Sequence, residues 1–296
     1  SEANSINERL LSLLPFNIAA EYTSPAEEKT RPADTPPGPG RRIRSGQLRG
    51  FVLTIRGHRG ETEMDAFTYR NGELCAEQIA LRELAERFGT PLYVYSRNFL
   101  REQYRALSAA MAGADPLICY SVKANSNRAV IRTFLDEGAG LDIVSGGELY
   151  RALDAGADPA RIVFAGVGKT REEIDYALRS DIRFFTVESE PEALRISERA
   201  TALKLTGRIA FRINPDVDPQ THTYISTGKK ENKFGLDIDR TMRACETAAG
   251  LPGIELTGLH MHIGSQILSP EPFARALEKV GRLCAELKSR YPAFTT

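Results

Sequence analysis

Short apolar runs alternate with amphipathic stretches along the chain from about residue 117 to residue 290. Apolar runs of strand length predict buried β-strands, and apolar positions that recur three and four residues apart predict amphipathic helices. We expect strands at 117–122, 140–144, 161–165, 183–187, 208–213 and 254–262, and helices at about 127–137, 146–155, 170–180, 190–202, 239–249 and 270–290. Strands that alternate with helices at this spacing predict parallel βαβ units.

Six such units predict an α/β fold of the TIM-type (β/α)8 barrel class. An open nucleotide-binding sheet fits less well, because no glycine-rich fingerprint follows the first predicted strand. The segment Gly166–Thr170 imitates the end of a phosphate-binding P-loop, but Val163 stands where that motif requires glycine, so we reject it. Since a complete barrel has eight strands, we expect this barrel to be incomplete at the C-terminus.

The first part of the chain differs in composition from the rest. Residues 1–63 combine many prolines and arginines with few apolar residues, and the first methionine is Met64. This composition predicts a disordered or non-native N-terminal extension. Its many acidic residues, and the lack of a secretory apolar segment, argue against a transit or signal peptide. We expect residues 64–116 to form a lead-in strand and helices, and residues 117–296 to form the barrel.

Ionisable side chains gather on one face of the predicted sheet. Residues two apart on a strand face the same way. This alternation places five side chains on the barrel interior near the carboxyl ends of their strands, where barrel enzymes carry their chemistry. They are Lys123, Asp142, Arg212, His260 and His262. Because buried charges are costly unless they are paired, packing alone does not account for this concentration.

Lys123 follows the first predicted strand directly and is the most informative of the five. A lysine that is desolvated at the carboxyl end of a strand loses its proton more easily, and its amine can then attack a carbonyl carbon to form a Schiff base. A solvated lysine in a loop is the plainer alternative. The other ionisable side chains on the same face favour the chemical role.

His260 and His262 lie on one face of a strand, a spacing that can bind a metal ion. Further ligands would be required, and the remaining histidines, His58 and His222, lie in the predicted extension and in a long loop. We therefore expect no metal, and a metal-dependent barrel hydrolase is the weakest alternative. We interpret His262 as a ring that stacks on a flat cofactor and His260 as a satisfied core histidine.

Three further motifs have a local interpretation. Gly264-Ser265-Gln266 precedes a predicted helix, where backbone amides and a serine hydroxyl can bind phosphate. The stretch from Ser145 to Glu148 fits a capping box at the start of a helix. The lysine-rich stretch 228–235 lies in a long loop and is either functional or a solvated run of charge.

Charge and cysteine content argue against several kinds of partner. The 39 basic residues balance the 39 acidic ones, so no net field favours nucleic acid or a membrane surface. Hydrophobic residues make up 42% of the chain, as in globular proteins, and no apolar run has the length of a transmembrane helix. The four cysteines show no metal-binding spacing, which is typical of a protein from a reducing cytoplasm.

Several motifs, in order along the chain, resemble those of one enzyme family. Tyr120-Ser121-Val122-Lys123-Ala124-Asn125 resembles the lysine motif of the barrel-type pyridoxal-phosphate decarboxylases, which have the alanine-racemase-like fold. The similarity extends from Met64 to Thr296. More narrowly, the chain is similar to the diaminopimelate decarboxylase family at Phe88–Tyr95, Gly140–Leu149, Arg212–Pro219, Lys233–Gly235 and Gly258–Gln266.

The resemblance implies a role for each candidate residue. Lys123 would hold pyridoxal phosphate as a Schiff base and act in catalysis. His262 would stack on the pyridine ring, and Ser265 would help to hold the phosphate. Asp142 and Arg212 would lie near the ring.

The implied reaction is the pyridoxal-phosphate-dependent decarboxylation of meso-2,6-diaminopimelate to L-lysine and carbon dioxide, by a homodimer when the protein is full length. The family's glycine-rich phosphate loop, its Glu-Pro-Gly-Arg segment and its C-terminal β domain, which carries a proton-donating cysteine, have no counterpart in this sequence. We therefore expect a barrel truncated after its sixth βα unit and inactive alone. The alternatives are a decarboxylase of the same barrel class for arginine, ornithine or carboxynorspermidine, or a non-catalytic pyridoxal-phosphate-binding homologue.

Overall fold

The computed structural model describes residues 66–217, 234–264, 267 and 269–294. The predicted N-terminal extension and most of the lysine-rich stretch 228–235 lie outside the described residues. The described chain divides into two compact units between Phe99 and Leu100. The sequence pattern predicts that the barrel begins at residue 117, and this domain boundary stays a prediction.

The unit before residue 100 contains a small antiparallel sheet in the order β1-β2-β3. Strands β1 (Phe67–Arg70) and β2 (Glu73–Ala76) form a hairpin that turns at Asn71 and Gly72. Both turn residues have positive φ, 51° and 82°, as a two-residue hairpin turn requires. Strand β3 (Ile79–Ala80) leads directly into α2 (Leu81–Phe88).

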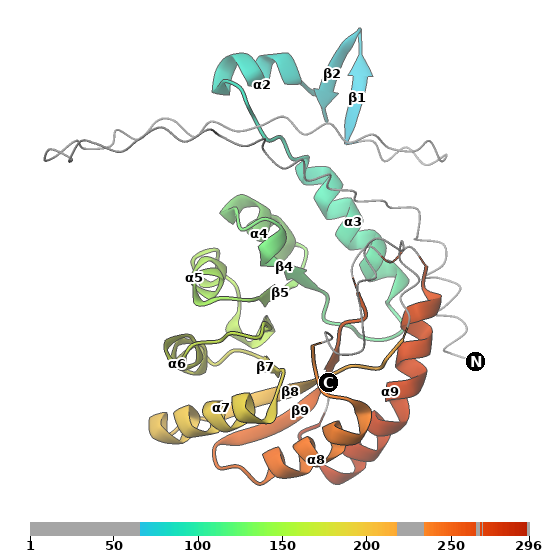
Figure 1. Cartoon of the computed structure of the whole chain (residues 1–296). Coiled ribbons are helices and arrows are strands. Elements are labelled where there is room, and N and C mark those ends of the chain that lie inside the picture. The colour runs from blue at the N-terminus through green and yellow to red at the C-terminus, as the bar shows by residue number, and fades with distance from the viewer. Residues whose placement is uncertain (1–65, 218–233, 265–266, 268, 295–296) are drawn as a thin grey trace, which may run out of the picture. The chain divides into compact units, whose positions relative to one another are not determined.

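The second unit is built on a six-stranded parallel sheet in the order β4-β5-β6-β7-β8-β9, with a helix after each strand. Figure 1 shows these helices following one another along one side of the curved sheet. The strands are β4 (Cys119–Ser121), β5 (Gly140–Ile143), β6 (Ile162–Phe164), β7 (Phe184–Val187), β8 (Gly207–Ile213) and β9 (Ile254–Met261). The helices are α4 (Arg128–Asp136), α5 (Gly146–Asp154), α6 (Arg171–Arg179), α7 (Glu190–Leu203), α8 (Ile238–Ala249) and α9 (Glu271–Arg290), with α3 (Arg97–Ala110) before the sheet and the short 3-10 helices η1 (Val122–Ala124) and η2 (Pro159–Arg161) between strands and helices.

The prediction of six βα units in a parallel sheet is confirmed. Each predicted strand and helix is present, and its bounds agree with the sequence pattern to within about three residues. In the described residues β4 and β9 are the edges of the sheet and do not pair with each other. The fold is therefore a TIM-type barrel that is incomplete, as expected. None of the described helices is both long and apolar enough to cross a bilayer.

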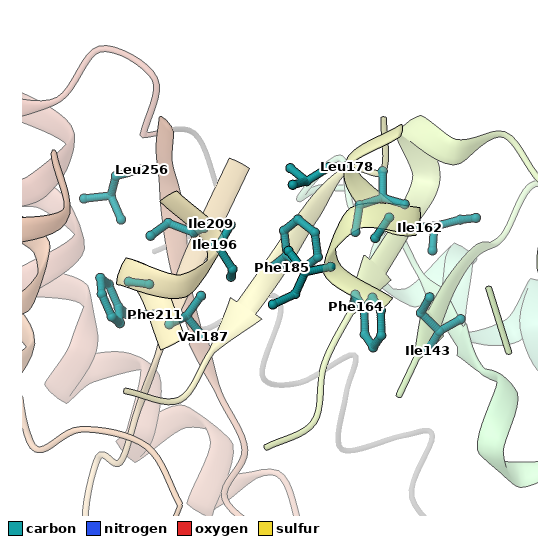
Figure 2. Packing of buried hydrophobic residues seen from close by; sticks show 14 of the residues in the cluster. Ile143, Ile162, Phe164, Leu178, Phe185, Val187, Ile196, Ile209, Phe211 and Leu256 are labelled. Atoms are coloured by element: carbon teal, nitrogen blue, oxygen red, sulfur yellow. The ribbon is translucent and has the colours of Figure 1, made fainter. Parts of the chain in front are cut away.

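The main core lies between the sheet and the helices. Ile209, Phe211 and Ile213 on β8 are fully buried, while Arg212 between them points to the opposite face. Figure 2 shows the core side chains of neighbouring strands and helices gathered together, including Phe164 and Phe185, whose ring centroids lie 6.0 Å apart. Burial of each such side chain stabilises the fold by roughly 1.5–3 kcal/mol, so this face fixes the orientation of every strand.

An irregularity in β9 decides which of its side chains face inward. The register pairs Ile209 with Leu256 but Ala210 with Gly258, so Thr257 is an extra residue, and its hydroxyl donates to the carbonyl of Ile209 at 3.1 Å. Such a bulge reverses the alternation of side chains after it. Consequently the residues at even positions from Gly258 onward turn away from the helices.

Side-chain caps begin five of the six helices that follow the strands, and α9 is the exception. Ser145 accepts a hydrogen bond from the backbone N–H of Glu148, so the serine half of the predicted capping box is confirmed. The glutamate half is wrong, because Glu148 accepts from the N–H of Val144 at 2.7 Å and not from that of Ser145. The carboxylate therefore binds the backbone of Val144, the first residue after β5, rather than that of the N-cap residue. A complete capping box, formed by Thr170 and Glu173, begins α6 instead.

We expect Gly140→Ala to lower the free energy of unfolding by about 1–3 kcal/mol, the usual cost of overpacking a core. A Cβ at this position would lie 2.6 Å from the carbonyl oxygen of Arg161 and 2.8 Å from Sγ of Cys119. Gly281→Ala is the matched control, because it makes the same chemical change on an exposed face of α9 with nothing within 4 Å. That control should raise stability by about 0.5–1 kcal/mol. Urea unfolding of both variants tests the pair, and equal effects would contradict the packing argument.

Candidate active site

Lys123 lies in η1, directly after β4. Its neighbours hold this turn in place. Tyr120 on β4 stacks on Phe134 of α4 with ring centroids 4.1 Å apart, and its hydroxyl donates to the carbonyl of Asn125 at 3.0 Å. Asn127 then caps α4 by accepting from the N–H of Ala129. The backbone on both sides of Lys123 is therefore anchored, while its side chain projects from a fixed point.

The side chain of Lys123 is exposed to solvent. The prediction that its place at the strand end desolvates the amine is therefore wrong for the described residues. The amine is instead accessible to a small molecule from outside. Its position at the carboxyl end of a parallel strand, where α/β barrels carry their chemistry, agrees with the sequence analysis.

Asp142 on β5 is the neighbour of Lys123 across the sheet. The register pairs Asp142 with Ser121, and the Ser121 hydroxyl donates to Oδ2 of Asp142 at 2.8 Å. Burial raises the pKa of Asp142, and the hydrogen bond from Ser121 and the positive charges of Lys123 and His262 oppose that rise. The charges of both Lys123 and His262 therefore act on the carboxyl group of Asp142.

His262 follows the last residue of β9 and is exposed at the same edge of the sheet. Its partial burial and the positive charges of Arg212 and Lys123 lower its pKa, while Glu188 and Asp142 act in the opposite direction. The imidazole is therefore neutral at neutral pH. Gly264 has a positive φ of 140°, and Ser265 lies outside the described residues.

Arg212 on β8 is held from two sides. Its Nη1 lies 2.8 Å from Oε1 of Glu188, and the two side chains are only 14% and 8% exposed. The guanidinium carbon lies 5.5 Å from the centroid of the Phe234 ring, within range of a cation–π contact. Gly235 lets this segment approach, because a Cβ there would lie 2.8 Å from the carbonyl oxygen of Arg212. The guanidinium thus lies between a carboxylate and an aromatic ring.

Three buried polar atoms around Arg212 have no hydrogen-bond partner among the described residues. They are Nε of Arg212, Oε2 of Glu188 and Nδ1 of His260, the residue that pairs with Arg212 in the register. Buried polar atoms are nearly always satisfied in native proteins. Their clustering on one interior face marks a place where a polar molecule can bind.

His260 was interpreted as a satisfied core histidine, and that interpretation is wrong for the described residues because its Nδ1 has no partner. Burial, followed by the positive charge of Arg212, lowers the pKa of His260 to about 4. In the part of the chain that the structure describes, no three His, Cys, Asp or Glu side chains are grouped to hold a metal ion.

The sequence analysis did not predict the acidic partner of Arg212, or the buried ion pair that contacts the backbone of that partner. Lys169, from the rejected P-loop segment, is almost fully buried and donates to Oε1 of Glu192 at 2.8 Å. The other carboxylate oxygen of Glu192 accepts from the N–H of Glu188 at 2.7 Å. Glu188 directly follows β7, so the rule that selected Lys123 from the end of its strand could also have selected Glu188.

Residues 97–293 match the family model described as "Pyridoxal-dependent decarboxylase, pyridoxal binding domain". Curated diaminopimelate decarboxylases of Pseudomonas aeruginosa and Aquifex aeolicus are 52% and 50% identical to the chain over 217 and 222 residues, which are 73% and 75% of this chain and 52% of each relative. The chain therefore spans about half the length of the curated relatives it matches.

Solved structures show the same likeness. The crystal structure of the diaminopimelate decarboxylase from M. jannaschii in complex with L-lysine superposes with a TM-score of 0.69 at 38% identity. The likeness covers 77% of this chain and 54% of that one. The βα arrangement and the rim that carries Lys123 and His262 thus belong to a fold already seen in decarboxylases.

We expect the stability of the protein to depend on His260 between pH 6.5 and pH 4. The folded state holds this imidazole neutral to about pH 4, while the unfolded chain protonates near pH 6.5. Stability is therefore lost as the pH falls through this window, by about 3 kcal/mol from this residue. In His260→Gln that part of the loss should vanish, as measured by urea unfolding at pH 7.5 and pH 4.5. Parallel pH profiles of the two proteins would contradict the assignment.

Proposed function

Because the chain belongs to the pyridoxal-dependent decarboxylases, we propose that it supplies the cofactor-binding barrel of an enzyme that converts meso-2,6-diaminopimelate to L-lysine and carbon dioxide. The observation that carries the proposal is the arrangement of Lys123, Asp142 and His262. These three side chains come from different strand ends, and their charges act on one another at one edge of the sheet. An accessible amine is the group that condenses with an aldehyde cofactor, and here an imidazole and a carboxyl group lie within electrostatic range of it.

The residues present fit pyridoxal phosphate. We propose that Nζ of Lys123 holds the aldehyde carbon, because this amine is exposed and stands on an anchored turn. The neutral imidazole of His262 would contact the flat ring, with Asp142 and Arg212 beside it. Ser265 would contribute its hydroxyl to the phosphate. The unpartnered polar atoms around Arg212 agree with a site that receives a polar group.

Each side chain has a definable task in this chemistry. When bound, the cofactor withdraws the electron pair that remains after carbon dioxide departs. Lys123 presents the amine that a substrate amine can replace. His262, kept neutral by burial and nearby positive charge, adds no charge of its own to the ring's environment. Asp142, fixed by Ser121 and raised in pKa, holds a proton on its carboxyl group at higher pH than a solvated aspartate does.

The choice of diaminopimelate rests on the relatives and not on the described site. The curated relatives at about half identity are diaminopimelate decarboxylases, and one related structure holds L-lysine, the product of that reaction. Arginine, ornithine and carboxynorspermidine remain the alternative substrates within the same barrel class. A non-catalytic homologue is disfavoured because both Lys123 and His262 are present at the rim.

We also propose that residues 117–296 act as the cofactor-binding domain with 64–116 as its lead-in, and that the complete protein is a cytoplasmic homodimer. The strand order supports the first statement. The family resemblance supports the dimer, and the cysteines, which are all free, agree with a reducing compartment. Sedimentation of the complete protein and fractionation of the cell decide these two points.

We expect borohydride reduction of the protein in the presence of pyridoxal phosphate to label the peptide that contains Lys123. Lys123→Ala should carry no label, since Lys123 is the amine placed at the rim. Lys288→Ala is the matched control, because it removes an exposed lysine from the last turn of α9 and should label like the unchanged protein. Peptide mass spectrometry gives the result, and a label that persists in Lys123→Ala would exclude this residue as the anchor.

We expect carbon dioxide release from meso-diaminopimelate by the protein expressed from the complete coding sequence, at a kcat/KM at least about a hundredfold above those for arginine, ornithine and carboxynorspermidine. A site built for polar groups rejects substrates that leave those groups unpaired by factors of this size or more. Assays with radiolabelled carboxyl groups compare the four substrates directly. A preference for any of the other three would replace diaminopimelate in the proposal, and no release from any would favour the non-catalytic homologue.

A further inference from the structure

We propose that Glu188 is a positioning residue of the cofactor site, which fixes the guanidinium of Arg212 beside His260 and His262. The proposal rests on cofactor binding at this rim and does not depend on which amino acid is decarboxylated. Glu188 acts through Arg212 and need not touch cofactor or substrate itself.

Four charged residues form a chain of contacts that ends at Arg212. Lys169 contacts Glu192 at 2.8 Å, Glu192 accepts from the backbone of Glu188 at 2.7 Å, and Glu188 contacts Arg212 at 2.8 Å. The side chains of the two ion pairs are at most 14% exposed. Lys169 is held further by the carbonyl oxygens of Gly166 and Thr186, both at 2.7 Å. These contacts connect the segment between β6 and α6 through α7 to Arg212 on β8, so the backbone of Glu188 is held in place beside Arg212.

The ion pair between Glu188 and Arg212 leaves buried polar atoms without hydrogen-bond partners. Oε2 of Glu188 and Nε of Arg212 are buried without a partner among the described residues, whereas Nζ of Lys169 has three acceptors. A pair that served the fold alone would be expected to satisfy its buried atoms, because each unsatisfied one is costly. The Glu188–Arg212 pair is therefore less completely hydrogen-bonded than the Lys169–Glu192 pair. His260, which pairs with Arg212 in the register, also has a buried Nδ1 without a partner among the described residues.

Positively and negatively charged groups act in opposite directions on the pKa of His262. Four ionisable groups act on this imidazole from different elements: Lys123 from η1, Asp142 from β5, Glu188 after β7 and Arg212 on β8. Lys123 and Arg212 lower its pKa, and Glu188 and Asp142 raise it. Glu188 is thus the group that both orients Arg212 and offsets its charge at His262. Without it the guanidinium would lose its ion pair, and Asp142 alone of the two carboxyl groups would oppose its charge at His262.

The test compares Glu188→Gln with Glu190→Gln. Glu190 pairs with Arg240 at 3.0 Å in an exposed ion pair two residues away, so the control removes the same charge without touching Arg212. We expect Glu188→Gln to weaken the binding of pyridoxal 5'-phosphate by about tenfold to a hundredfold, as is typical when a residue that orients a binding group is lost. Glu190→Gln should bind within about twofold of the unchanged protein. Equilibrium dialysis gives both affinities.

A double-mutant cycle separates positioning from a role in folding. If Glu188 acts through Arg212, adding Glu188→Gln to Arg212→Gln should cause no further loss of cofactor affinity. The double variant should also recover stability relative to Glu188→Gln, because no unpaired buried charge remains. A purely structural role predicts that affinity recovers together with stability. That result, or losses of affinity that add, would overturn the proposal.

A second readout uses the cofactor-free protein. NMR titration should show the His262 imidazole protonating at lower pH in Glu188→Gln than in the unchanged protein, and at higher pH in Arg212→Gln. Glu188→Asp should restore the His262 titration in part, since it keeps the negative charge. An unchanged titration in Glu188→Gln contradicts the proposal even where cofactor affinity falls. Failure of the unchanged protein to bind pyridoxal 5'-phosphate would instead count against the proposed function and leave the titration result standing.

Discussion

The burial of one face of the parallel sheet against the helices is the constraint from which the site follows. Ile209, Phe211 and Ile213 must face the helices, because exposing all three would cost a large part of the free energy of unfolding. Alternation then leaves Arg212 no direction except the interior. The same argument turns Asp142 inward between Leu141 and Ile143, both fully buried. The apolar side of each strand thus orients the polar groups, although none of the apolar residues takes part in chemistry.

Charged groups on an interior face are tolerated only when their charges are balanced. Glu188 forms an ion pair with Arg212, Glu192 forms one with Lys169, and the hydroxyl of Ser121 donates a hydrogen bond to Asp142. The imidazole of His260 remains uncharged because burial and Arg212 lower its pKa to about 4. The interior face therefore holds several ionisable groups without a large net charge. Lys123 and His262 are exposed at its edge.

The sequence was sufficient for the order of elements and for the inward residues of most strands. Alternation across β4, β5 and β8 needs no tertiary information, because each strand carries fully apolar residues on one face. The pairing of Glu188 with Arg212 was out of reach, because it depends on the register between β7 and β8, which the sequence pattern does not specify. The exposure of Lys123 was also unpredictable, because it depends on which side chains cover the rim. The hydrogen bond from the N–H of Val144 to the carboxylate of Glu148 depends on the local backbone conformation, which the sequence pattern does not specify.

The bulge at Thr257 shows how a single residue connects packing to the site. Leu256 is buried with the core and pairs with Ile209, so unbroken alternation from Leu256 would send Gly258, His260 and His262 toward the helices. The inserted Thr257 shifts that alternation by one residue, and its hydroxyl holds the shifted strand through the carbonyl of Ile209. Both demands are then met in one strand: the apolar first half lies in the core and the histidines of the second half lie on the interior face. The bulge, rather than the His-Met-His spacing alone, therefore brings His262 to the same rim as Lys123.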